Sequence, residues 1–177
     1  MPKPIVALLL LVTFAAFACT GSAPSSGPAE SAEGDGAGKD SARVAPEFTL
    51  PRIGGGDVSL ADGAGSVRLV DFWATWCAPC REEIPMLNEI QALYADRGFE
   101  ILAISTEEAS VIEKFVEEYS VQYTNLVGTD ELQEEYGAVG LPTAFLIDGE
   151  GRVAEVFFGA KPRSALVKKI EEMLAAS

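Results

Sequence analysis

The chain of 177 residues has no histidine and only three cysteines. A structural zinc site takes about four ligands from cysteine, histidine or carboxylate side chains, and this sequence has too few of the first two to favour one. A covalently bound c-type haem requires a histidine directly after the second cysteine of its attachment motif, and here Arg81 follows Cys80. We therefore expect no metal and no other cofactor.

Basic residues are also scarce, with 13 Lys and Arg against 27 Asp and Glu, which gives a net charge of −14. Such a chain repels phosphate backbones, so we expect no nucleic-acid partner. A solvated acidic surface explains this charge more simply than an acidic docking face for a basic partner does. Hydrophobic residues make up 48% of the chain, which is enough for the core of one ordinary domain.

The first apolar run covers residues 5–17, which is shorter than the roughly 20 residues of a membrane-spanning helix. Lys3 gives it a short positive start, and the small residues Ala16 and Ala18 flank Phe17 at its end. We interpret residues 1–18 as a secretory signal.

Cys19 follows this segment directly, and the junction resembles a bacterial lipoprotein box, in which the cysteine is lipidated and becomes the mature N-terminus. Ala16 stands where leucine is usual and Phe17 is bulky, so ordinary cleavage after Ala18 and an uncleaved anchor remain alternatives. An odd cysteine in an exported protein requires an explanation, and lipidation supplies one. We therefore predict a membrane-anchored lipoprotein of the cell envelope, with its domain on the extracytoplasmic side.

Residues 19–44 consist mainly of Gly, Ser, Ala, Pro and acidic residues, with almost nothing to bury. This composition predicts a disordered tether, with a root-mean-square reach of about 25–30 Å as a flexible coil. A merely dispensable tail would have the same composition. We expect the folded part of the chain to begin at Ala45, so that residues 45–177 form one domain.

The most informative stretch covers residues 70–85, an apolar run that leads through Cys77-Ala78-Pro79-Cys80 into charged residues. The run predicts a buried strand, and Pro79 fits an early helical position, which needs no amide hydrogen. Cys77 should therefore lie at a strand-to-helix junction, with Cys80 one turn further on. Because a helix N-terminus favours a thiolate, Cys77 is the candidate nucleophile of disulfide exchange, and Cys80 can resolve the mixed disulfide.

Strand and helix patterns alternate along the rest of the domain. The alternation predicts a β-hairpin over residues 45–60, a turn at Gly149-Glu150-Gly151, and a capping box at Ser110 and Glu113 that opens a helix. Further strands are predicted at residues 68–73, 99–105, 123–127, 143–148 and 153–158, and further helices after Cys80 to about Arg97, over residues 131–136, and from Pro162 onward.

The run Asp71-Phe72-Trp73-Ala74 followed by Trp76-Cys77-Ala78-Pro79-Cys80 resembles the thioredoxin superfamily. The continuation Arg81-Glu82-Glu83-Ile84-Pro85 is similar to the membrane-tethered TlpA/ResA branch. The resemblance covers residues 45–177. It implies an α/β protein with a thioredoxin fold, in which helices flank a central mixed sheet, with an N-terminal β-hairpin and a central insertion at about residues 107–127.

The resemblance also implies site residues. Asp71 matches the buried acid of thioredoxins, which exchanges a proton with the resolving thiol, although many TlpA members have asparagine there. A charged residue in an apolar strand is costly unless its pKa rises, but Asp71 could instead point towards solvent. Glu83 shares a helix face with Cys80 and matches a ResA glutamate that helps set the thiol pKa values; the alternative is an ordinary surface glutamate.

Two further features belong to the implied substrate site. Thioredoxin-like proteins have a cis-proline beside the cysteines, and Leu141-Pro142 stands at that position. A cis bond there would let the backbone of Leu141 pair with an extended substrate peptide. Trp76 should cover one side of the cysteine pair, although ordinary aromatic packing at a strand end would explain it equally well.

The function that the resemblance implies is that of an extracytoplasmic thiol–disulfide oxidoreductase. Most relatives act as reductants, which pass electrons from a membrane dithiol donor to the disulfides of proteins, including apocytochrome c. A net oxidant or isomerase and a redox-inactive peptide-binding module remain alternatives. A peroxiredoxin-like peroxidase is a weaker one, because that family has threonine where Ala74 stands.

Overall fold

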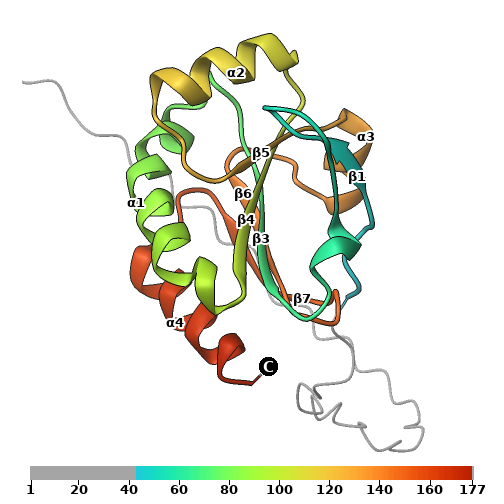
Figure 1. The fold of residues 1–177 in the computed structure, drawn as a ribbon, viewed down its shortest axis with the longest axis vertical. Coiled ribbons are helices and arrows are strands. Elements are labelled where there is room, and N and C mark those ends of the chain that lie inside the picture. Colours follow the sequence, from blue (N-terminus) through green and yellow to red (C-terminus); the bar gives the residue numbers. More distant parts are fainter. Residues whose placement is uncertain (1–42, 177) are drawn as a thin grey trace, which may run out of the picture. The chain divides into compact units, whose positions relative to one another are not determined.

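A five-stranded mixed sheet forms the centre of the computed structural model, in which residues 43–176 are described (Figure 1). These residues belong to one compact unit, Gly38–Ser177. The strands lie in the order β5 (Thr124–Val127), β4 (Phe99–Ser105), β3 (Val67–Phe72), β6 (Thr143–Ile147) and β7 (Val153–Phe158). Strands β3, β4 and β5 are parallel to one another, and β6 runs antiparallel to both β3 and β7. The predicted thioredoxin fold is confirmed.

Helices α1 (Ala78–Tyr94) and α4 (Arg163–Leu174) cover one face of the sheet (Figure 1). Between them and the sheet lies a cluster of buried apolar side chains that includes Leu69, Leu87 and Leu166. Helix α1 continues through Pro85 and ends in a 3-10 turn, Ala95–Arg97. Cys77 and Cys80, at the start of α1, lie on this side of the sheet.

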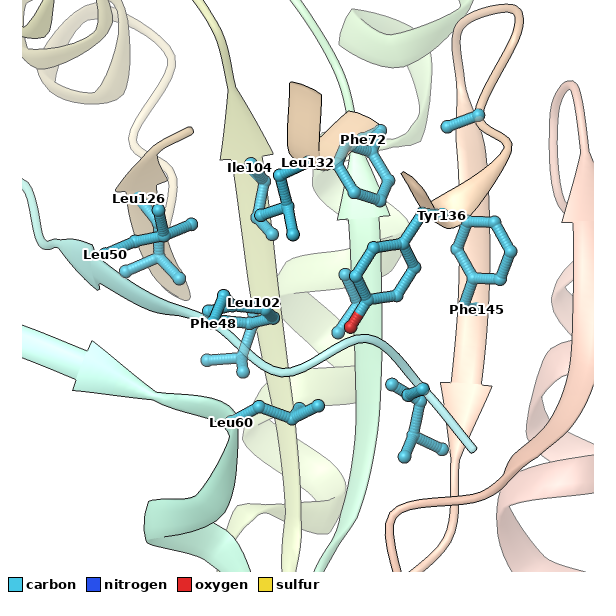
Figure 2. Packing of buried hydrophobic residues seen from close by; sticks show 14 residues of the cluster. Phe48, Leu50, Leu60, Phe72, Leu102, Ile104, Leu126, Leu132, Tyr136 and Phe145 are labelled. Atoms are coloured by element: carbon cyan, nitrogen blue, oxygen red, sulfur yellow. The ribbon is translucent and has the colours of Figure 1, made fainter. Parts of the chain in front are cut away.

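The opposite face is covered by a small hairpin, β1 (Thr49–Pro51) with β2 (Asp57–Ser59), the 3-10 turn Leu60–Gly63 and helix α3 (Asp130–Tyr136). Figure 2 shows the core beneath them, where the ring of Tyr136 contacts the rings of Phe72 and Phe145, with centroid distances of 5.2 and 5.1 Å. The Tyr136 hydroxyl donates to the carbonyl of Pro46 at 2.8 Å. Tyr136 thereby links the segment before β1 to the apolar core on this face of the sheet.

The helix of the central insertion differs from its prediction. Helix α2 (Ala109–Glu118) begins after Glu108, and no side chain caps it. The predicted capping box at Ser110 is therefore wrong, because Ser110 already lies in the first helical turn and lacks the extended backbone of a cap. Of its apolar residues, Ile112 and Phe115 are buried, whereas Val111 remains largely exposed.

The predicted signal at residues 1–18, Cys19 and nearly all of the predicted tether lie outside the described residues. Backbone contacts begin slightly before Ala45, because Val44 forms a β-bridge with Arg152 and the amide of Val153 donates to the carbonyl of Arg43 at 2.8 Å. None of the helices between residues 43 and 176 is both long enough and apolar enough to cross a bilayer.

Candidate active site

Cys77 and Cys80 form a disulfide at the start of α1, with a Cα–Cα distance of 5.3 Å. Cys77 is the N-cap of the helix, and its Sγ accepts a hydrogen bond from the amide of Cys80 at 3.3 Å. Pro79 lies in the first turn, as predicted. An amide and a helix N-terminus that both point at one sulfur stabilise negative charge there, so after reduction the thiolate is favoured at Cys77.

The two cysteines are almost fully buried, whereas Trp76, directly before Cys77, is 71% exposed. Burial at the end of a strand therefore does not explain this tryptophan, and the packing alternative for Trp76 is wrong. Trp76 directly precedes Cys77 in the sequence, and its exposed indole is accessible to a partner protein.

Asp71 lies on the sheet face covered by α1, not towards solvent. The strand register places it between Ala103 of β4 and Ala144 of β6, so both neighbours on that face are small. Ala103 belongs to the same buried cluster as Cys77 and Cys80. The two alanines leave room beside the Asp71 carboxylate, and the alternative in which Asp71 points away from the interior is wrong.

The room beside Asp71 is filled by Lys161, a residue that the sequence reasoning missed. The Lys161 ammonium donates to Asp71 at 3.0 Å and to Glu83 at 2.9 Å, and the Lys161 side chain is 0% exposed. The backbone amide of Lys161 also donates to the Glu83 carboxylate. Asp71, Glu83 and Lys161 thus form one buried cluster, called here the acid–lysine cluster, at the second turn of α1.

The charges of the acid–lysine cluster are unequal, because two carboxylates share one ammonium. Burial raises the pKa of Asp71, and Lys161 offsets this only in part. Burial likewise raises the pKa of Glu83 against the opposing effect of Lys161. For Lys161 burial lowers the pKa, but Asp71 and then Glu83 outweigh it, so the pKa is raised. The cluster therefore keeps its ammonium and can hold a further proton on a carboxyl group.

Glu83 is buried on the helix face that it shares with Cys80, so the alternative of a solvated surface glutamate is wrong. Helical spacing relates Glu83 to Cys80, but no local pattern relates either carboxylate to Lys161, which is 78 residues from Glu83 and 90 from Asp71. The only available signal was indirect: a buried carboxylate needs a cation or a proton, and few basic residues exist to supply the cation.

The loop before β6 completes the site. The Leu141–Pro142 peptide bond is cis, and Leu141 packs against the cluster that contains the cysteines. The amide of Gly159 donates to the carbonyl of Pro142 at 2.8 Å, which joins this loop to the segment that carries Lys161. The structure therefore places Leu141 against the buried cluster that contains Cys77 and Cys80, and it holds Asp71 and Glu83 together through Lys161. The catalytic and binding roles of the predicted site residues stay predictions.

The sheet, its covering helices and the disulfide at the start of α1 define a thioredoxin-like thiol–disulfide oxidoreductase. Residues 42–156, more than half of the chain, match the AhpC/TSA family. The thiol-disulfide oxidoreductase ResA of Geobacillus thermodenitrificans (strain NG80-2) is 34% identical over 132 residues, which are 73% of this chain and 76% of that protein. ResA of Bacillus anthracis is 35% identical over 135 residues, which are 72% and 77% of the two chains.

Solved structures similar to this chain include thiol–disulfide exchange proteins as well. A thiol:disulfide interchange protein of the thioredoxin family from Chlorobium tepidum TLS has a TM-score of 0.70 and 28% identity, and the match covers 77% of this chain and 99% of that one. The chain therefore belongs to the AhpC/TSA family, and within it to the ResA-like thiol–disulfide oxidoreductases.

Proposed function

We propose that the protein reduces disulfides of other proteins on the extracytoplasmic side of a membrane, and that apocytochrome c is one of its substrates. The observation that carries the chemistry is the position of Cys77 at the N-cap of α1, where the amide of Cys80 points at its sulfur. The direction of electron flow rests on the resemblance of Arg81-Glu82-Glu83-Ile84-Pro85 to the TlpA/ResA branch.

The proposed reaction starts from the dithiol. The Cys77 thiolate attacks one sulfur of the substrate disulfide, a mixed disulfide forms, and the other substrate sulfur leaves as a thiolate. Cys80 then loses its proton and attacks the Cys77 sulfur, which releases the second substrate thiol and closes the Cys77–Cys80 disulfide. Two electrons pass to the substrate, and a membrane dithiol donor restores the enzyme by the reverse exchange.

The acid–lysine cluster is the proposed proton acceptor and donor for Cys80. One of its members, Glu83, lies in the second turn of α1 on the same helix face as Cys80. Because burial raises the pKa of both carboxyl groups, the cluster can take the thiol proton and return it when the enzyme is reduced again. Trp76, Leu141 and Pro142 are the proposed contacts for the substrate peptide.

The reduction potential of the Cys77–Cys80 pair tests the proposed direction. Titration of the dithiol–disulfide equilibrium in a dithiothreitol series should give a value near that of thioredoxin, about −270 mV. A value near that of DsbA, about −120 mV, would identify a net oxidant instead. A pair that exchanges with neither glutathione nor dithiothreitol would mean a redox-inactive binding module.

Lipidation of Cys19 is the proposed origin of the membrane location. It is supported by the apolar run at residues 5–17 and by the small residues on either side of Phe17. Mass spectrometry of protein extracted from membranes should show a mature N-terminus at Cys19 that carries a diacylglyceryl group, and Cys19→Ser should release the protein from the membrane fraction. Mature protein that begins with unmodified Cys19 would contradict the proposal.

A further inference from the structure

A carboxylate outside the acid–lysine cluster holds the turn that leads to the nucleophile. Glu107, half-buried just after β4, accepts two hydrogen bonds of 2.7 Å from Thr75, one from its amide to Oε2 and one from its hydroxyl to Oε1. The hydroxyl of Ser105 donates to the same carboxylate at 3.1 Å, and Ser105 is buried. Neither the proposed reaction nor the family resemblance assigns a role to Glu107.

The turn between β3 and α1 depends on this carboxylate. Backbone hydrogen bonds hold the chain on either side of this turn. Before it, the amide of Trp73 donates to the carbonyl of Ile104, and after it, the amide of Cys77 donates to the carbonyl of Ala74. Between them, both polar donors of Thr75 go to Glu107. Two donors on one carboxylate give fixed geometry as well as the added strength of charge-assisted hydrogen bonds.

The position of Glu107 is itself well defined. Its backbone amide donates to the Ser105 hydroxyl at 3.3 Å, so the residue is bonded to Ser105 through both main chain and side chain. The insertion that follows makes a second contact with the redox segment, because the ring of Phe115 on α2 packs against that of Trp73 at a tilted angle, with a centroid distance of 5.2 Å. The turn that carries Thr75 and Trp76 is thus supported from the end of β4 and from α2.

The negative charge of Glu107 also affects the sulfur chemistry. Thr75 is only two residues before Cys77, so the carboxylate that it binds is a fixed negative charge near the nucleophile. A like charge nearby disfavours a thiolate and opposes the helix N-terminus, which favours it. A less stable thiolate makes the dithiol form less favourable, and the pair becomes a stronger reductant.

We propose that Glu107 is a positioning residue with two effects: it holds the Thr75–Trp76 turn in place, and its charge biases the Cys77–Cys80 pair towards the disulfide. The second effect deepens the proposed reductase function and rests on it for its biological meaning. Both effects can be measured without a substrate protein.

Glu107→Gln and Glu107→Ala separate the two effects. Glutamine keeps the shape and one acceptor oxygen but removes the charge, whereas alanine removes both. Glu108→Gln is the matched control, since Glu108 is the neighbouring carboxylate, is exposed, and makes no side-chain cap for α2. The readouts are the glutathione equilibrium constant, the pH profile of Cys77 alkylation in the reduced protein, and hydrogen exchange of the Thr75 amide.

We expect Glu107→Gln to shift the glutathione equilibrium about 3- to 10-fold towards the dithiol, which corresponds to roughly 15–30 mV, and to move Cys77 alkylation to lower pH. Glu107→Ala should cause the same shift and also increase the exchange rate of the Thr75 amide at least about tenfold, because that amide loses its acceptor. Glu108→Gln should match the unmodified protein in all three measurements.

The proposal is overturned if Glu107→Gln gives the same equilibrium constant as Glu108→Gln, or if Thr75 exchange is unchanged in Glu107→Ala. If the alanine variant fails to fold, the equilibrium constant and alkylation profile of the glutamine variant decide alone. The absolute potential of the unmodified protein tests the reductase function separately. A protein that proves to be an oxidant but shows these variant shifts would refute the function and support the role of Glu107.

Discussion

Replacing Lys161 with methionine is expected to destabilise the protein by about 3–5 kcal/mol at neutral pH, the cost of breaking a buried ion pair by removing one partner. The methionine side chain fills much of the space, but Asp71 and Glu83 then face each other without a cation. Both are buried, so they can escape the cost only by binding protons.

The pH dependence of this loss follows from the sign of the shifts. Burial already raises the pKa of Asp71 and Glu83, and removal of Lys161 raises both further. A carboxyl group whose folded pKa is raised lowers stability above its unfolded pKa, about 4, and has no such cost below it. The deficit of Lys161→Met should therefore be large at pH 7.5 and nearly absent below pH 4.

Urea unfolding of the oxidised protein at the two pH values measures the deficit. Lys168→Met is the matched control, because the Lys168 side chain on α4 is 79% exposed and its loss should change little. Adding Asp71→Asn and Glu83→Gln to Lys161→Met should restore most of the stability, since no buried charge remains. An equal deficit at both pH values, or no recovery in the triple variant, would show that Lys161 acts through packing.

Replacing Asp71 with asparagine is expected to slow resolution of the mixed disulfide by about 10- to 100-fold at neutral pH, the low end of general acid–base effects. Asparagine keeps the shape of the side chain but cannot accept the Cys80 proton. Quenched-flow trapping of the mixed disulfide measures the resolution rate directly, and Asp96→Asn, at an exposed position, is the control.

Asp71→Asn should also be more stable than the unmodified protein, because it removes one of the two buried negative charges that share Lys161. Asp71 is not an isolated buried acid, because it shares Lys161 with Glu83. Removal of its charge leaves Lys161 and Glu83 as a balanced pair. Since the pKa of Asp71 is raised in the folded state, its cost exists above the unfolded pKa, about 3.9, and the gain in Asp71→Asn should disappear in acid.

The two measurements on Asp71→Asn give independent answers. Slow resolution with a stability gain at neutral pH identifies Asp71 as a proton-transfer residue that is retained at a cost to stability. An unchanged resolution rate together with lower stability would make it a structural residue, and the acid–base role would then pass to Glu83, whose replacement by glutamine could be assayed in the same way.

The sequence alone is sufficient to predict those parts of the structure that depend on residues close together in the chain. The strand before Cys77 and the helix after it were predictable because apolar periodicity and Pro79 act within a few residues of one another. The hairpin turn at Gly149-Glu150-Gly151 followed from turn chemistry that is equally local. The N-cap position of Cys77, and hence the chemistry of its sulfur, was therefore accessible without a structure.

Predictions were weaker where two local explanations competed. The pattern at Ser110 and Glu113 matched a capping box, yet α2 begins at Ala109 after an N-cap residue, Glu108, whose side chain makes no capping hydrogen bond. Similarly, spacing placed Glu83 on the face of Cys80 but did not show whether another segment covers that face. Helical periodicity shows on which side of the helix a residue lies, but it does not show which other segment packs against that side.

Only the tertiary structure revealed which distant residues meet. Lys161 reaches Asp71 across 90 residues of sequence, and Glu107 reaches Thr75 across 32. These contacts arise because the sheet places the ends of β3 and β4 side by side and because the segment after β7 returns to Glu83 in the second turn of α1. An ionisable residue in an apolar strand indicates from the sequence alone that a partner or a proton is needed. Which residue is that partner depends on the chain topology, because topology determines which side chains can reach the charge.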